Sequence, residues 1–329
     1  MKKTTATLIS IVAAASLALA GCSGKGTTAD SAATASASAS ASADVPVDRN
    51  YTGTLPTVSG EFAKSATIEA GTGEKPTTVV AHTIVEGSGR EVTTNDYLKV
   101  HYAGVLWDDG KVFDTSFERP DPTDPSKTTA IPAGFALSGV IPGWTYGLAG
   151  QHVGDRVELV IPPQYGYGEQ GAGDSIPGNA TLVFVVDILD AVDLSDTSSL
   201  GSATPTDESI AGVTVTGDLG AKPTLSFTDG ASAPTEMTVV TLATGSGKVL
   251  DENDTMFYHE TTSPWGKADQ TESSYDLGHS VPSPGAIGKN EFFSGRTVGS
   301  RLLIVVPSQQ DPAQIVVSVI DIVGSVAMN

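Results

Sequence analysis

The chain has 329 residues, and its 38 acidic and 18 basic side chains give a formal net charge of −20. The length predicts two domains, and the abundance of glycine and proline favours β-rich, turn-rich structure over helix bundles. We expect no nucleic-acid partner, because such binding needs a basic surface, and we expect the acidic surface to keep the protein soluble.

The first 22 residues are typical of a lipoprotein signal. Two lysines precede an apolar stretch, Leu8–Ala20, which is shorter than the ~20 residues that a spanning helix needs. The stretch ends in Leu19-Ala-Gly-Cys22, which resembles a bacterial lipobox and contains the only cysteine of the chain. We therefore predict a signal peptide over residues 1–21 and a lipid on Cys22 that anchors the chain to the cell membrane, outside the cytoplasm. An ordinary cleaved signal peptide is the alternative.

A predicted flexible tether follows, over residues 22–50. It consists mainly of Gly, Ser, Thr, Ala and Asp, and such a segment cannot bury enough apolar surface to fold. As a Gly/Ser-like coil it would span roughly 30 Å and hold the folded part off the membrane. Loss of the signal peptide leaves 16 basic and 38 acidic residues, a net charge of −22.

The remaining sequence contains an internal repeat. Residues 76–89 are similar to residues 234–247, at an offset of 158. Two further matches follow in the same order at offsets of 145 and 134: Val153–Arg156 with Val298–Arg301, and Val186–Leu189 with Ile320–Val323. Two copies favour tandem domains over a solenoid. We predict a first domain over 51–191 with an N-terminal extension, a linker over 192–207, and a second domain over 208–329.

The strands and one helix of the first copy can be predicted from hydrophobic periodicity. Alternation around residues 98–102 and 157–161 predicts strands with one buried face, and residues 181–188 are apolar on both faces, as in a central strand. Asp108-Asp-Gly110 predicts a hairpin turn. Residues 143–150 have helical character, and Gly150 can end that helix. One short helix on an antiparallel sheet is an α+β arrangement.

Conventional catalytic groups do not stand out. The five histidines lack metal-ligand spacing, and no nucleophile elbow, phosphate-binding loop or calcium-binding loop appears. We therefore expect no cofactor and no metal. The first copy instead concentrates aromatic and branched residues beside turns, which in most proteins would simply be core.

Seven segments of the first copy follow one another in a distinctive order: His101-Tyr-Ala-Gly104, Asp109-Gly-Lys-Val-Phe-Asp-Thr-Ser116, Val140-Ile-Pro-Gly-Trp144, Val153-Gly-Asp-Arg156, Ile161-Pro-Pro163, Tyr165-Gly-Tyr-Gly168 and Ile176-Pro-Gly-Asn-Ala-Thr-Leu-Val-Phe184. In this order they resemble the FKBP family of drug-binding prolyl isomerases. The resemblance implies two FKBP-like domains, each an antiparallel sheet wrapped around one short helix, with the second copy degenerate.

The resemblance also implies roles for individual residues. Trp144 should form the floor of a proline pocket, and the Ile141 N–H and the Tyr167 hydroxyl should bind substrate carbonyls. Asp114 should lie at the pocket edge, with a turn-capping carboxylate as its alternative role, and Tyr167 has a purely structural hydroxyl as its alternative. The resemblance implies pocket walls formed by Tyr102, Phe113, Val140, Ile141 and Phe184. Ile176 should lie on the loop that covers the site. Phe135 and Arg119 are further expected substrate-binding residues.

The sequence departs from the family pattern in both copies. Ala133 stands where the family usually has an aromatic residue, which opens one wall and leaves the affinity for bulky ligands in doubt, and residues 120–129 are an insertion. In the second copy no tryptophan matches Trp144. Glu260 aligns with Tyr102, and Thr271-Glu272 aligns with Phe113-Asp114. We expect the second copy to be non-catalytic.

The function that the resemblance implies is peptidyl-prolyl cis–trans isomerisation, as a foldase (rotamase) outside the cytoplasm. The expected partners are proline-containing exported polypeptides, macrolide-type ligands, and the membrane through the lipid on Cys22. Two alternatives stay open. One is a non-catalytic chaperone or peptide-binding surface lipoprotein, which the opened pocket wall and the degenerate second copy favour. The other is a purely structural envelope lipoprotein.

Overall fold

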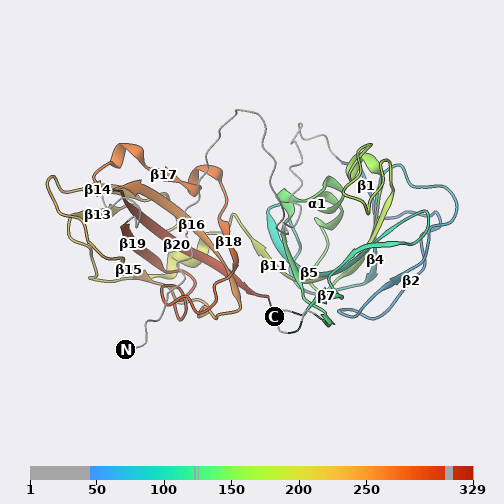
Figure 1. Ribbon diagram of the computed structural model, residues 1–329, viewed down its shortest axis with the longest axis horizontal. Helices are drawn as coiled ribbons and strands as arrows, with labels where there is room; N and C mark the ends of the chain where they lie inside the picture. Colours follow the sequence, from blue (N-terminus) through green and yellow to red (C-terminus); the bar gives the residue numbers. More distant parts are fainter. Residues whose placement is uncertain (1–44, 122–123, 125, 308–313, 329) are drawn as a thin grey trace. The chain divides into compact units, whose positions relative to one another are not determined.

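Two seven-stranded β-sheets with the same strand order form the framework of the described chain (Figure 1). The computed structural model describes residues 45–121, 124, 126–307 and 314–328. The predicted signal peptide, Cys22 and most of the predicted tether lie outside these residues. We call residues 45–193 the N-terminal half and residues 204–328 the C-terminal half.

The first sheet has its longest strands at its centre. Its order along the sheet is β1 (Val47–Asp48), β4 (Val79–Val85), β10 (Arg156–Ile161), β11 (Leu182–Asp193), β5 (Asp96–Leu106) and β6 (Val112–Thr115), and β9 (Ala133–Ala136) also pairs with β5. All neighbours are antiparallel except β1, which pairs in parallel with β4. The predicted central strand is confirmed, because β11 lies between β10 and β5 and is buried on both faces over residues 182–188.

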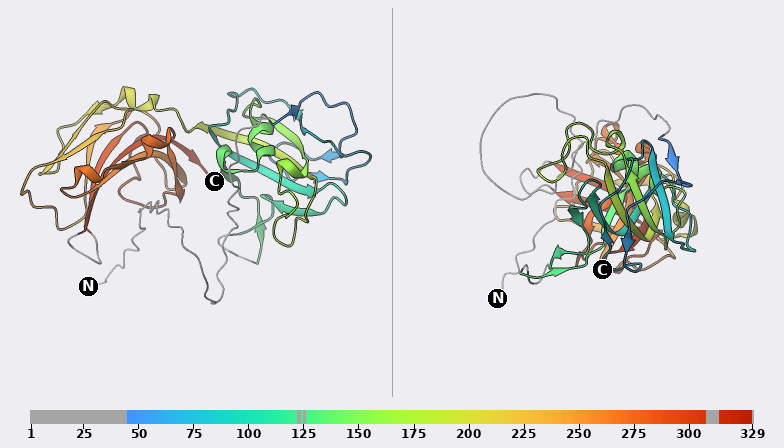
Figure 2. Two further views of the ribbon diagram at one scale, coloured as in Figure 1. Left: turned by 90° about the horizontal axis from the view of Figure 1, so that it is seen from above. Right: turned by 90° about the vertical axis from the view of Figure 1, so that its right-hand side faces the viewer.

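One short helix packs on one face of this sheet (Figures 1 and 2). Helix α1 (Pro142–Leu148) starts with proline at its first turn, where no N–H is needed. It ends before Gly150, which adopts a left-handed φ of +80°, as predicted. A Cβ atom on Gly143 would lie 2.5 Å from Cγ2 of Ile161, so glycine permits the close approach of helix and strand.

The opposite face of the first sheet is covered by the N-terminal extension. Strands β2 (Val58–Ser59) and β3 (Thr67–Ile68) pair with each other, and Ile68 packs against the outward-facing valines of the sheet and Trp107. Arg156 holds this extension: it pairs with Asp187 at 2.6 Å and donates to the carbonyl of Lys64 at 2.8 Å. All six residues of β10 are therefore buried. The prediction of a single buried face for residues 157–161 is wrong, because the extension covers the second face.

The predicted insertion forms a small β-ribbon. Strand β7 (Arg119–Pro120) pairs with β8 (Thr128–Thr129), and these strands project from the rest of the N-terminal half (Figure 2). Two 3₁₀ turns complete this half, η1 (Leu137–Gly139) before α1 and η2 (Pro163–Tyr165) after β10.

The second sheet has the same strand order but lacks the helix. Its order is β12 (Thr204–Pro205), β15 (Thr238–Thr244), β19 (Arg301–Pro307), β20 (Ile315–Ala327), β16 (Asp254–Pro264) and β17 (Glu272–Ser273), and β18 (Val281–Ala286) also pairs with β16. An extension, β13 (Val213–Thr216) with β14 (Thr224–Phe227), packs on it. Arg301 pairs with Asp321 at 2.6 Å and donates to the carbonyl of Ala221, as Arg156 does in the first sheet with Asp187 and Lys64.

The expected helix of the second copy is absent from the described residues. Between β18 and β19 the chain makes turns, and Ile287 and Phe293 are buried against the sheet instead of a helix. The only helical segments of the C-terminal half that the structure describes are two 3₁₀ turns, η4 (Ala268–Gln270) and η5 (Ser274–Leu277). The connection between β18 and β19, which the structure describes throughout, contains a single α-helical hydrogen bond, from the Ser294 N–H to the Asn290 carbonyl, and no helix, so the expectation of one helix per copy is wrong here.

Two predicted connecting segments contain ordered structure. Strand β1 begins at Val47, inside the predicted tether, and Arg49 donates to the carbonyl of Gly147 at the end of α1, at 3.1 Å. The predicted linker contains η3 (Ser198–Ser202), whose Leu200 is completely buried. Within the described residues no helix is both long enough and apolar enough to cross a membrane.

Candidate active site

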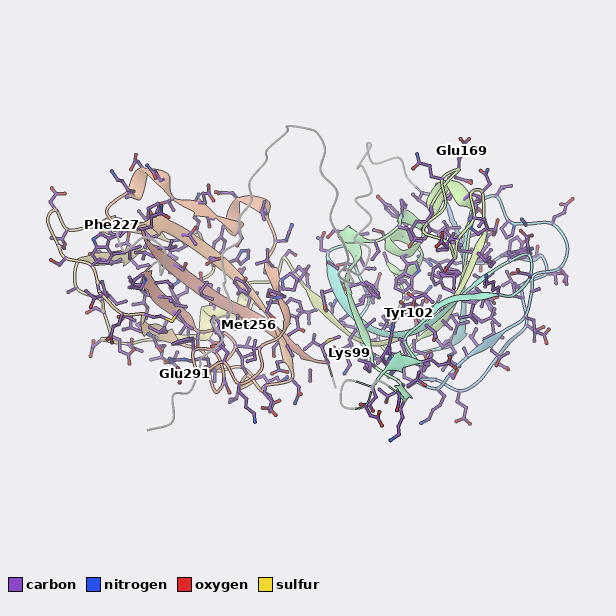
Figure 3. All side chains as sticks on the ribbon, viewed as in Figure 1. Lys99, Tyr102, Glu169, Phe227, Met256 and Glu291 are labelled. Carbon is purple, nitrogen blue, oxygen red and sulfur yellow. The ribbon has the colours of Figure 1, made fainter. Side chains whose placement is uncertain are left out.

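Four aromatic rings from four different elements meet in the N-terminal half. Trp144 of α1 lies at the centre, with ring centroids 5.3 Å from Phe184 of β11, 5.4 Å from Phe135 of β9 and 5.5 Å from Tyr102 of β5 (Tyr102 is labelled in Figure 3). The three pairs are edge-to-face, with interplanar angles of 86°, 76° and 87°. This is the geometry that the quadrupoles of aromatic rings favour. The helix therefore places Trp144 beneath rings that the strands supply.

Phe113 of β6 extends this cluster and depends on a glycine. Its ring lies 5.3 Å from that of Phe184. A Cβ atom on Gly104 would lie 2.6 Å from Cζ of Phe113 and 2.8 Å from Cε1 of Phe184, so any side chain at position 104 would displace a ring. Gly104 belongs to one of the family-like motifs, but its role was not predicted from the sequence. Only the packing of two rings over β5 explains the glycine.

Burial separates the members of this aromatic site into an inner and an outer group. Tyr102, Trp144 and Phe184 keep 4 % of their surface exposed, and Ile176, on the loop between β10 and β11, keeps 7 %. The outer group is half-buried and consists of Phe113, Phe135, Val140, Ile141 and Tyr167. The buried indole Nε1 of Trp144 has no hydrogen-bond partner among the described residues. Nine of the residues that the sequence motifs single out thus lie close together, four of them buried and five half-buried.

A polar triad borders the aromatic site. The Tyr102 hydroxyl donates to Asp114, and Arg119 donates to the same hydroxyl at 2.7 Å and pairs with Asp114 at 3.0 Å. The Asp114 and Arg119 side chains are 42 % and 38 % exposed. Burial and the Asp114 carboxylate both raise the pKa of Tyr102, so its hydroxyl stays protonated. Asp114 thus contacts the side chains of Tyr102 and Arg119.

A second tyrosine lies on the loop that follows η2. The Tyr167 ring packs against the core around Trp144, and its hydroxyl has no hydrogen-bond partner in the part of the chain that the structure describes. Burial, and then the negative charge of Asp114, raise its pKa, so this hydroxyl also keeps its proton and can donate.

Ser116 supports the site from behind and was not predicted. It is fully buried, and its Oγ accepts a hydrogen bond from the Tyr102 N–H at 2.9 Å and lies 2.9 Å from His101 Nδ1. Burial lowers the pKa of His101. These contacts fix the position of the chain directly after β6, and they thereby help to orient the side chain of Asp114 on β6. The Ser116–Tyr102 contact joins residues 14 apart in the sequence, which the pairing of β6 with β5 brings together.

Ala133 and Phe135 lie on the same strand beside the aromatic site. Ala133 pairs with Val100 on β5 and contributes only a methyl group, whereas Phe135, two residues later, reaches Trp144.

The C-terminal half places other residues at the equivalent positions. In the first sheet Gly104 pairs with Phe184 and Asp114, and in the second sheet Thr262 pairs with Ser318 and Glu272. Tyr102 pairs with Val186, and Glu260 with Ile320. The strand registers thus match the sequence alignment. The positions of Tyr102 and Phe184 hold a glutamate and a serine in the second sheet.

The fold and this geometry together define a class of site. A curved sheet closed by one short helix presents an apolar, ring-lined surface with protonated tyrosine hydroxyls and one carboxylate at its rim. Such a surface binds an apolar chain segment by shape, and its polar rim can form hydrogen bonds with backbone carbonyls.

Comparisons with known proteins identify the family. The model of the FKBP-type peptidyl-prolyl cis-trans isomerases matches residues 88–189. A probable FKBP-type peptidyl-prolyl cis-trans isomerase of Haemophilus influenzae is 47 % identical over 104 residues, 32 % of this chain and 39 % of that protein, so the match spans less than half of that relative. A probable FK506-binding protein of Corynebacterium glutamicum is 36 % identical over 124 residues, 38 % of this chain and 96 % of that protein.

A solved peptidyl-prolyl cis-trans isomerase from Pseudomonas syringae is 32 % identical, with a TM-score of 0.29, and the match covers 34 % of this chain and 74 % of that one. The chain belongs to the family of FKBP-type peptidyl-prolyl cis-trans isomerases.

Proposed function

We propose that this protein isomerises X–Pro peptide bonds at the aromatic site of its N-terminal half. The observation that carries the proposal is the position of Trp144, beneath the rings of Tyr102, Phe135 and Phe184 and beside the Tyr102–Asp114–Arg119 triad. The family match spans the same residues.

The chemistry needs no nucleophile. Rotation about an X–Pro bond has a barrier of ~18–20 kcal/mol, which amide resonance sets. Water stabilises the planar amide because that form is more charge-separated than the twisted one. A ring-lined surface excludes water and so favours the twisted transition state, and each 1.36 kcal/mol of such preference gives about tenfold in rate.

The rim residues would orient the substrate around the twisting bond. In this proposal the proline ring rests on Trp144, while the Ile141 N–H and the Tyr167 hydroxyl donate to carbonyl oxygens of the peptide. Asp114 faces the twisting amide and at the same time holds the Tyr102 hydroxyl. The same apolar surface would take macrolide-type ligands, with weaker contact along the wall where Ala133 stands.

The proposed place of action is outside the cytoplasm, at the membrane. This rests on the basic start, the short apolar stretch and the Leu19-Ala-Gly-Cys22 sequence, which indicate a lipid-anchored exported protein. Its substrates would then be exported polypeptides that contain proline.

The C-terminal half would be a second, non-catalytic copy of the same domain. Its equal strand order and its matching Arg301–Asp321 pair support a common origin. Glu260 and Ser318 at the positions of Tyr102 and Phe184 support the loss of the proline site.

The decisive experiment compares two tryptophan variants of the full chain. Trp144→Leu should lower kcat/KM for a short X–Pro peptide by about tenfold or more, because it removes the floor of the site. Trp265→Leu, in the C-terminal half, should leave the rate unchanged. Rates would be measured by NMR exchange, with circular dichroism to verify folding. An unaltered rate in folded Trp144→Leu would show that the aromatic site is not where isomerisation occurs.

A further inference from the structure

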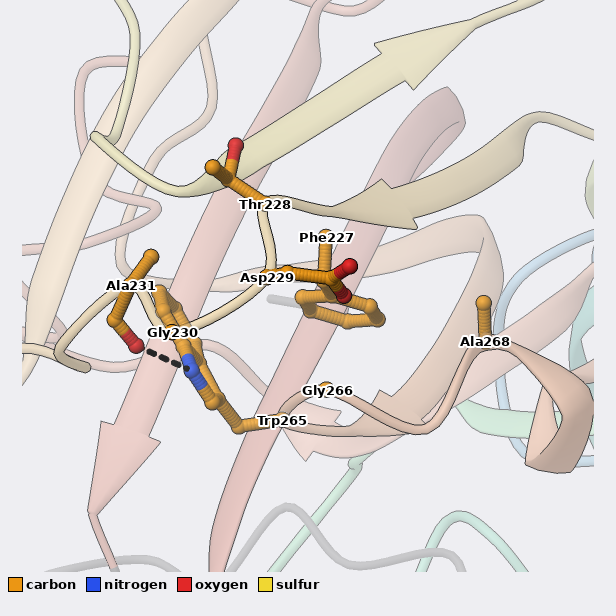
Figure 4. A pocket seen from close by; sticks show the side chains of 8 residues that line it. All are labelled: Phe227, Thr228, Asp229, Gly230, Ala231, Trp265, Gly266 and Ala268. Carbon is orange, nitrogen blue, oxygen red and sulfur yellow. Dashed lines mark hydrogen bonds between the residues drawn. The ribbon is translucent and has the colours of Figure 1, made fainter.

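The C-terminal half contains an open pocket that is separate from the aromatic site (Figure 4). It lies where the loop after β14 meets the loop after β16 and has a volume of about 300 Å³. Phe227 and Trp265 supply its aromatic surface, with ring centroids 5.7 Å apart. The Trp265 indole donates to the carbonyl of Ala231 at 3.3 Å, which fixes the orientation of its ring.

The equivalent position in the N-terminal half is closed. Trp107 follows β5, and its backbone N–H donates to the carbonyl of Thr181. In the same way Trp265 follows β16, and its backbone N–H donates to the carbonyl of Ile315. Trp107 is only 2 % exposed, because the backbone of Gly71 lies directly on its indole. Trp265 is half-buried. At this tryptophan the C-terminal half is therefore the open one, whereas the aromatic site belongs to the N-terminal half.

The pocket carries an unpaired negative charge. Asp229 and Phe227 both line it (Figure 4). In the described part of the chain this carboxylate has no hydrogen-bond or ion-pair partner. Asp269 is exposed and directly follows the lining residue Ala268. Lys267, which directly precedes Ala268, is the basic residue nearest to the lining residues along the chain. Aromatic faces beside a free carboxylate attract a cation, since the ring quadrupole and the charge act in the same direction.

We propose that this pocket binds a cationic side chain, an arginine or lysine of an extended polypeptide. The guanidinium or ammonium group would lie against Trp265 and Phe227 and pair with Asp229. The net charge of −20 over the whole chain would assist the approach of a basic segment. This binding does not depend on isomerase activity. It would give the C-terminal half a part in holding a polypeptide.

The test follows the indole N–H signal of Trp265 in the full chain by NMR, with Trp265→Phe to assign it. The probe is an acetylated, amidated tripeptide with arginine between two glycines, which lacks proline and so avoids the aromatic site. It should shift the Trp265 signal alone. Asp229→Asn should weaken this binding about fivefold, and ~0.5 M salt should weaken it similarly. Asp207→Asn removes an exposed carboxylate outside the pocket and should leave the affinity unchanged.

Three outcomes would overturn the proposal. The same tripeptide with glutamine in place of arginine could shift the signal as strongly, which would make the charge irrelevant. Folded Asp229→Asn could bind the arginine tripeptide with unchanged affinity. A neutral oligosaccharide of N-acetylglucosamine could shift the signal while the arginine tripeptide does not, which would identify a sugar-stacking site instead.

Discussion

Glu158 lies in the middle of β10 with 2 % of its surface exposed, and its Oε1 atom has no partner among the described residues. Its strand neighbours are His82 and Val185, and Arg156, two residues earlier, is engaged by Asp187. Burial raises the pKa of the Glu158 carboxyl to about 7. The sequence pattern predicts a solvent-facing glutamate here. The N-terminal extension reverses that, because it removes water from this face of the sheet.

This burial predicts an unusual pH dependence of stability. Between pH 4.5 and about 7 the folded chain keeps a proton that the unfolded chain releases, so the free energy of unfolding should fall as pH rises through this window. The upper limit of the loss is about 3 kcal/mol. Glu158→Gln should remove this slope and stabilise the N-terminal half at pH 8 by about 1–3 kcal/mol. The measurement is urea unfolding at pH 5 and pH 8, and a variant with an unchanged slope would contradict the prediction.

At the scale of elements, the N-terminal arm and α1 form one unit. Strand β1 extends the sheet edge beside β4, and Arg49 donates to the carbonyls of Gly147, Tyr146 and Ala149 at the C-terminal end of α1. The last carbonyls of a helix lack partners within the helix, and a guanidinium there also complements the helix dipole. Residues at the end of the predicted tether therefore stabilise the helix that carries Trp144.

Arg49→Ala should loosen α1 and lower isomerase activity several-fold, while Arg49→Lys should restore part of it by supplying a charge without the fork of donors. Hydrogen exchange of the amides in residues 142–149 reports the helix directly and should speed up in Arg49→Ala. Lys75→Ala, which breaks an exposed ion pair with Asp108, is the matched control and should change neither measurement. Equal exchange in Arg49→Ala and the unmodified chain would show that the arm does not hold the helix.

At the scale of the whole molecule, one sheet plan serves two different surfaces. Both halves keep the strand order, the arginine–aspartate pair and an extension on the outer face. The N-terminal half adds a helix and an aromatic site, and the C-terminal half opens a pocket at Trp265. The buried frame is common to both halves and the loops differ, because surface loops tolerate changes in sequence far better than close-packed cores do.

The expected anchoring can be tested on the whole chain. Cys22→Ser removes the acceptor for the lipid and should release the protein from the membrane fraction after expression in a bacterium that processes lipoproteins. Isomerase activity should be unchanged, because Cys22 is not among the residues of the proposed aromatic site. Fractionation followed by immunoblotting gives the result, and retention of Cys22→Ser in the membrane fraction would argue against the lipid anchor.

The sequence by itself determined the family, three strands of the first sheet and the helix at Trp144, because these depend on local periodicity and on motifs of fixed spacing. Only the tertiary structure decided which faces are buried. Glu158, Gly104 and Ser116 acquire their roles from partners far along the chain, and Trp107 and Trp265 differ solely in what covers them. Burial and ring packing arise from contacts between distant segments, and a local pattern in the sequence does not contain those contacts.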